Sequence, residues 1–347
     1  MVFSFALASF TIGVLLGPLL LSRISPRFRL TCLAMMAAAS LAIAGTASGF
    51  GVFVAAYGVG FGFSSGALYS YAVTHASSSA APNIWVPVSV AAFGLGGMIF
   101  GPMYIWLTEL GWSLLAVLPA FACLTCVAVA GLFIRSDLLE TDLHQTKEAV
   151  FIRPNRVIFR LWTIFVTGSC TGLIVLGLAS TFMAADAARQ ATAVLAAATG
   201  NTVGRLSATA IAARFGPASG IVGALSVTIL ALTGLLVVRD FGIVIALLFL
   251  IALSYGQVAS QTPLFVSRHV PAETFASAFG WVFTGWGVAG MLGPWGGLDG
   301  FWRQPAACAS PCLAASRFAL LASCRSDGFQ GLRSRKRIDK SIDKSNL

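Results

Sequence analysis

Between Gly200 and Pro217 the sequence reads GNTVGRLSATAIAARFGP. The stretch is largely apolar, yet Arg205 stands near its middle and it ends on Arg214-Phe-Gly-Pro217. A similar tetrapeptide, Arg23-Ile-Ser-Pro26, lies 191 residues earlier (214 − 23 = 191). The stretch therefore indicates a repeated chain in which one charged side chain lies within a buried helix.

The surrounding chain has the composition of a membrane protein. Of its 347 residues, 57% are apolar and only 10% are charged, and the mean hydropathy is +0.87. Soluble domains carry about 25% charged residues. A membrane-spanning helix needs roughly 20 apolar residues, and the alternation typical of strands is absent. These features predict an all-α polytopic membrane protein with ten spans, near 2–21, 29–48, 50–73, 84–107, 112–134, 158–184, 190–213, 217–238, 241–266 and 275–298.

Basic residues between these segments predict the orientation. Loops that are expected inside hold Arg23 and Arg27, Arg153 and Arg156, and Arg214 and Arg268, whereas the outside loops hold only Arg189 and Arg239. Residues 301–347 depart from the pattern, with nine Lys and Arg against three Asp (9 − 3 = +6). Their composition shifts at Gly300, so we expect a disordered or frameshifted tail. The tail has no aromatic interleaving, and nucleic acid is not an expected partner.

The repeat extends beyond the opening tetrapeptide. Gly97-Met-Ile-Phe-Gly101-Pro102 resembles Gly290-Met-Leu-Gly293-Pro294, and Tyr57-Gly58 pairs with Tyr255-Gly256 at an offset of 198. Two similar halves in one orientation predict two helix bundles related by an axis along the membrane normal. Relative to a parent of six plus six helices, the first and last are missing. The expected division is 1–134 (first bundle), 135–157 (cytoplasmic loop), 158–300 (second bundle) and 301–347 (tail).

These motifs resemble a known family. GPLLLSRISPRFRL (17–30) and GRLSATAIAARFGP (204–217) resemble the two copies of a conserved cytoplasmic loop of the major facilitator superfamily, and GMIFGP (97–102) resembles its antiporter motif. Residues 160–177, 201–206 and 275–295 look most like the branch of oxalate/formate antiporters and monocarboxylate transporters. The family's loop aspartate is replaced by Ser22 and Ala213, which weakens its gate.

The resemblance implies a cytoplasmic gate formed by Arg23, Arg27 and Arg214, together with Gly97, Gly101 and Pro102. For the arginines, positive-inside topology alone is an equal alternative.

Arg205 is the principal candidate for substrate binding. A central arginine costs roughly 2.5–3.5 kcal/mol to insert, and the acidic residues all fall at segment ends. A guanidinium that faces a cavity without a protein counter-ion suits a carboxylate, which it binds through two parallel hydrogen bonds. Asn201 lies four residues earlier on the same helical face, and its amide can add a second donor to the substrate. The alternative is a structural arginine held by backbone carbonyls or reaching the cytoplasmic surface.

The resemblance refines this expectation. In monocarboxylate transporters an aspartate occupies the position of Asn201, so its absence favours exchange over proton coupling. The oxalate branch also uses a lysine in the helix that corresponds to 275–298, which has none here, and this favours a monoanion. Tyr57, Tyr255 and Gln257 lie on segments that line the cavity in the family, although core packing explains each equally well.

The sequence therefore predicts a monomeric, multi-pass carrier of small organic anions in a bacterial inner membrane, working by alternating access. The alternative is a truncated remnant that does not transport. His75, His144 and His269 form no cluster, Cys123 and Cys126 have no second ligand pair, and no nucleophile–base pair is evident. We expect neither an enzyme nor a metal site or cofactor, and the only expected partners are the anion and the lipid bilayer.

Overall fold

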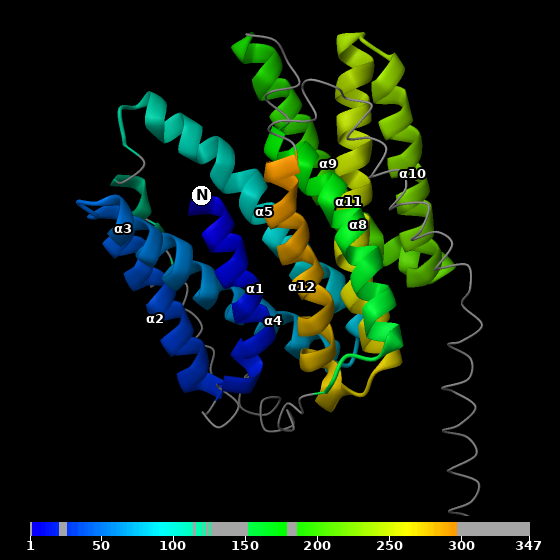
Figure 1. The fold of residues 1–347 in the computed structure, drawn as a ribbon, viewed down its shortest axis with the longest axis horizontal. Coiled ribbons are helices and arrows are strands. Elements are labelled where there is room, and N and C mark those ends of the chain that lie inside the picture. Colours follow the sequence, from blue (N-terminus) through cyan, green and yellow to red (C-terminus); the bar gives the residue numbers. More distant parts are fainter. Residues whose placement is uncertain are drawn as a thin grey trace, which may run out of the picture.

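The computed structural model describes residues 2–20, 26–113, 116–119, 121–122, 125, 152–178 and 186–296, which are helical with short connections (Figure 1). The all-α class is confirmed. The helices are α1 (Val2–Leu20), α2 (Pro26–Gly45), α3 (Phe50–Phe53), η1 (Val54–Phe61), α4 (Gly62–Ser77), α5 (Pro82–Glu109), α8 (Arg156–Leu178), α9 (Ala187–Phe215), α10 (Pro217–Val237), α11 (Phe241–His269) and α12 (Ala272–Gly296). The π-helix η1 joins α3 and α4 into one continuous helix.

Nine of the ten predicted spans coincide with these helices. The remaining one, 112–134, lies largely outside the described residues, as do Arg23, most of the predicted cytoplasmic loop and the tail 301–347. Six helices of the described chain are long and apolar enough to cross a membrane by length and hydropathy alone. Helix α9 is not among them, because Asn201, Arg205 and several small or polar residues lower its hydropathy.

Short polar residues and one glycine set the helix ends. Asn155 caps α8, Asp186 caps α9 and Asp240 caps α11, each through a side-chain oxygen that accepts backbone N–H groups of the first turn. Gly216 ends α9 with a φ of +80°, a value that glycine adopts without strain. Pro217 then begins α10, where a missing N–H is harmless.

The helices form two groups that meet along α12 and α5. In Figure 1, α1–α5 lie on one side and α8–α11 on the other, with α12 between α1 and α8. Helix α1 packs on α12, and α5 packs on α9. The sequence repeat makes α1 equivalent to α9 and α5 equivalent to α12. The contact of α1 with α12 is therefore equivalent to the contact of α9 with α5. This is the arrangement expected for halves related by a pseudo-two-fold axis.

Glycines at two helix crossings show how the repeat aligns. A Cβ on Gly13 would collide with the Phe63 carbonyl in α4, and a Cβ on Gly204 would collide with the Leu253 carbonyl in α11. The offsets are 191 and 190 (204 − 13 and 253 − 63). Both crossings therefore use a glycine to let two backbones approach closely.

A second pair of crossings corrects one predicted match. A Cβ on Gly66 would collide with the Phe10 carbonyl, and a Cβ on Gly256 would collide with the Asn201 carbonyl. Because Phe10 corresponds to Asn201 in the repeat, Gly66 is the counterpart of Gly256 (256 − 66 = 190). The predicted pairing of Tyr57-Gly58 with Tyr255-Gly256 is therefore wrong. The offset of 198 matches Gly256 with Gly58, which lies two helical turns before the true counterpart, Gly66.

Candidate functional site

Arg205 lies at the middle of α9 and is only 3% exposed. Its Nε donates to Oδ1 of Asn201 at 3.1 Å, which confirms that the two side chains share one face of the helix. Its Nη1 donates to the carbonyl oxygen of Val90 at 3.0 Å. Val90 belongs to α5, so the guanidinium connects the first half of the chain with the second.

Two glycines give the arginine its position. Gly256 of α11 lies against the backbone of α9, where an added Cβ would stand 2.9 Å from the Arg205 nitrogen. Gly94 of α5 lies against the side chain, where an added Cβ would stand 2.7 Å from Cδ of Arg205. A larger residue at Gly256 would push α11 away from α9, and one at Gly94 would displace the side chain of Arg205.

Aromatic rings and no carboxylate surround the charge. Cζ of Arg205 lies 5.6 Å from the ring centre of Phe93 and 5.7 Å from that of Tyr255, within the range of cation–π attraction. Arg205 forms no salt bridge with any acidic side chain in the described ranges. Asp186 and Asp240 are instead exposed residues that cap the N-termini of α9 and α11.

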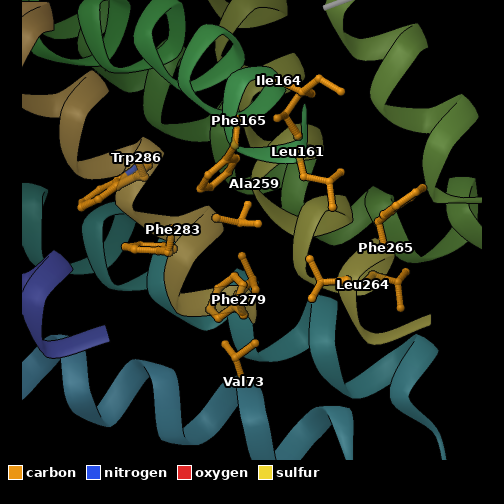
Figure 2. Packing of buried hydrophobic residues seen from close by; sticks show 14 of the residues in the cluster. Val73, Leu161, Ile164, Phe165, Ala259, Leu264, Phe265, Phe279, Phe283 and Trp286 are labelled. Atoms are coloured by element: carbon orange, nitrogen blue, oxygen red, sulfur yellow. The ribbon is translucent and has the colours of Figure 1, made fainter. Parts of the chain in front are cut away.

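The guanidinium borders a narrow cavity with free room for about one water-sized group. The first half contributes Phe10, Tyr69 and Phe93, and the second half contributes Phe165, Arg205, Tyr255, Ala259, Phe283 and Trp286. Figure 2 shows the rings of Phe165, Phe283 and Trp286 near Ala259. The cavity thus combines one cationic group with a wall made mainly of aromatic rings.

Like Tyr69, Tyr255 supplies a hydroxyl group to this wall. It is 3% exposed, and its hydroxyl oxygen accepts a hydrogen bond from Nε1 of Trp286 at 2.7 Å. Indole and guanidinium nitrogens donate only, so neither neighbour can take the phenolic proton. That proton remains available to an acceptor in the cavity.

Three of the predicted binding residues, Asn201, Tyr57 and Gln257, are not among those that line the cavity. Tyr57 stacks between Phe53 and Phe61, with ring centres at 5.6 and 5.5 Å, and packs with a separate apolar cluster of α2. Gln257 is buried but does not line the cavity. Its Nε2 donates to Ser207 Oγ at 2.6 Å, and its Oε1 accepts from Gln261 at 2.7 Å, so it ties α9 to α11.

The structure adds site residues that the sequence analysis missed, among them Phe10, Tyr69, Phe93 and Trp286. The corrected repeat carries a signal for Phe10, because it occupies in α1 the position that Asn201 occupies in α9 (201 − 191 = 10). By the same offset Val14 corresponds to Arg205 (205 − 191 = 14). The equivalent positions of the first half are thus apolar, and the charge comes from the second half alone.

Little of the predicted gate can be tested. Arg214 is exposed at the end of α9, with Cζ 5.3 Å from the ring centre of Phe215. Arg27 lies in α2, and Gly97, Gly101 and Pro102 lie in α5, but their side-chain surroundings are outside the described structure. At the same end of the molecule, Arg268 donates to Oδ1 of Asn83 through Nε and Nη2, which links α11 to α5.

Two helical bundles related by a repeat, with a buried cation at their interface, define a multi-pass membrane protein of the transporter class. The family model of the Major Facilitator Superfamily matches residues 1–294. The chain belongs to this superfamily.

A solved structure supports the fold. The human organic anion transporter MFSD10 (TETRAN) superposes with a TM-score of 0.72 at 16% sequence identity. The superposition covers 93% of this chain and 82% of that protein. A search of curated protein sequences found no match.

Proposed function

We propose that the protein is a secondary active transporter of small organic anions, monocarboxylates in particular, that exchanges them across a bacterial inner membrane. The observation that carries the proposal is the buried Arg205, which has no acidic partner among the described residues and borders a cavity shared by both halves. Arg205 binds the carboxylate, Asn201 orients the guanidinium, and Tyr255 offers a second donor.

The hydrogen-bond capacity of Arg205 favours an anion site over a purely structural role. A guanidinium has five N–H groups, and the bonds to Asn201 and Val90 use two of them. Neither acceptor is charged, so neither neutralises the cation. A carboxylate in the cavity would supply both the missing charge and further acceptors, and a charge-assisted pair of this kind is about twice as strong as a neutral hydrogen bond.

The position of the cavity favours alternating access. Its wall combines rings of α1, α4 and α5 with groups of α8, α9, α11 and α12. A rocking motion of the two bundles would therefore widen the cavity toward one side of the membrane at a time. In this mechanism Arg23, Arg27 and Arg214 belong to the inner gate, along with Gly97, Gly101 and Pro102 of α5.

The proposal is tested with the full chain in liposomes. Vesicles preloaded with unlabelled acetate should take up labelled acetate faster than vesicles loaded with sulfate, because an exchanger moves label only against an internal substrate. Protein-free vesicles give the background. Uptake at the background rate under both conditions would support a non-transporting remnant and overturn the proposal.

Replacing Asn201 with aspartate is expected to weaken anion binding by about tenfold or more at pH 7, since the new carboxylate neutralises the guanidinium beside it. Asn201→Ala removes only the orienting bond, so it should have a smaller effect. The half-saturating acetate concentration for exchange measures both. Equal effects of the two substitutions would show that the charge of Arg205 plays no part in anion binding.

A further inference from the structure

The composition of the cavity wall points to a more specific ligand. We propose that the site selects monocarboxylates with an aromatic body, such as benzoate, over both short aliphatic acids and dicarboxylates. This inference rests on the proposed function, because it assumes that Arg205 binds a carboxylate. The inference goes beyond the proposed function because it assigns the rest of the cavity wall to the part of the substrate that does not bear the charge.

The charge of the site fits one carboxylate and no more. Arg205 is the single charged residue among those that line the cavity. A dicarboxylate would bring a second charge into an apolar, low-dielectric space with no cation to receive it, which is strongly unfavourable. A monocarboxylate leaves the loaded site neutral.

The remaining wall fits a flat apolar body. Seven of the nine lining residues are aromatic, and neighbouring rings contact one another with centres 5–7 Å apart, as between Phe10 and Phe93 (5.5 Å) and between Phe283 and Trp286 (5.1 Å). Pairs at such separations are favourable in tilted or offset arrangements. A substrate ring that enters between them replaces ring–ring contacts with equivalent ones, whereas a hydroxyl or amine there would lose its hydrogen bonds to water.

Arg205, Tyr255 and Trp286 adjoin one another in this wall. Tyr255 has its ring over Arg205 and its hydroxyl held by Trp286. A carboxylate bound to the guanidinium can therefore also accept a hydrogen bond from the hydroxyl of Tyr255. The rest of the substrate then extends toward Phe10 and Phe283. Trp286 acts in this arrangement as a positioning residue, because it fixes the direction of the Tyr255 hydroxyl.

The free room is water-sized, so the wall must open to admit a ring. The rings that line the cavity come from both halves: Phe93 lies on α5, and Phe283 lies on α12. Separation of the two halves enlarges the cavity without breaking either bundle. We therefore expect aromatic substrates to bind in a state in which the halves have moved apart.

The test is equilibrium binding to the purified full chain, with labelled benzoate and labelled acetate as probes and oxalate, cyclohexanecarboxylate and benzamide as competitors. Benzoate is expected to bind about tenfold or more tightly than acetate, because its ring buries additional apolar surface. Oxalate should compete poorly because of its second charge, and benzamide should fail because it has none.

Two variants separate selectivity from folding. Phe283→Leu should weaken benzoate binding more than acetate binding, whereas a folding defect would weaken both alike; Phe159→Leu, at a ring 63% exposed on α8, should change neither. Tyr255→Phe keeps the ring and should weaken the binding of both acids equally. Trp286→Phe should reproduce the effect of Tyr255→Phe, and Trp286→His, which can retain an N–H donor, should restore part of the loss.

The outcomes distinguish this inference from the proposed function. If acetate binds as tightly as benzoate in an Arg205-dependent manner, the anion site stands and the aromatic selectivity is wrong. If oxalate binds more tightly than benzoate, the proposed selectivity is likewise wrong, and the anion site still stands. If neither labelled acid binds, both the inference and the proposed function fail.

Discussion

Arg205→Ala is expected to reduce carboxylate exchange by about a hundredfold or more while the protein still inserts into the membrane. Removing one partner of a buried charged pair costs 2–5 kcal/mol, and the arginine is the only charge that lines the cavity. The substitution also removes the energetic cost of burying an uncompensated guanidinium, so it should not impair insertion. The measurement is acetate counterflow in liposomes, normalised to the amount of inserted protein.

Two further variants define what the arginine contributes. Arg205→Lys keeps a positive charge but loses the planar fork and the bond from Nε to Asn201, so it should recover only a small part of the exchange. Arg239→Ala is the matched control, because Arg239 is exposed at the end of α10 and donates only to backbone carbonyls there. Undiminished counterflow by Arg205→Ala would exclude the residue from the anion site.

Gly256→Ala is expected to produce the second large effect, a loss of both stability and exchange. The added methyl group would overlap the Asn201 carbonyl and press on the backbone of Arg205, so α9 and α11 must separate at the site itself. Overpacking of this kind costs typically 1–3 kcal/mol. The melting temperature of the purified protein should therefore fall, and counterflow should fall further because Arg205 moves.

Gly223→Ala provides the matched control. Gly223 lies within α10, and a Cβ there would meet nothing within 4 Å. Alanine is the better helix former by about 1 kcal/mol, so this variant should be as stable as the parent or slightly more stable. If Gly256→Ala melts at the same temperature as Gly223→Ala, the close crossing of α9 and α11 is not required.

The helices and the centre of the site follow from sequence because the information is local. Spans show as runs of apolar residues, and Asn201 and Arg205 are neighbours by the period of one helix, which the hydrogen bond between them confirms. Tyr255 also lies at the cavity. Each of these inferences needs only one segment of the chain.

The rest of the cavity depends on how helices cross, which no single segment encodes. Phenylalanine occurs throughout the apolar helices, so the sequence alone does not separate Phe93, at the cavity, from rings that face outward. The choice of Tyr57 over Tyr69 shows the same limit. Tyr57 is predicted from the segment that lines the cavity in the resembled family, and a segment does not specify which of its side chains faces the cavity.

The uneven division of charge between the halves has an electrical consequence. Because Val14 stands where the first half would repeat Arg205, the transporter that we propose would hold one positive charge in its empty site and none when the site holds a monoanion. A membrane potential acts on a moving charge with about 2.3 kcal/mol per 100 mV, and it leaves a neutral complex unaffected. In the proposed cycle, a voltage that is negative inside would therefore oppose the outward return of the empty site, whereas one-for-one exchange would move no net charge.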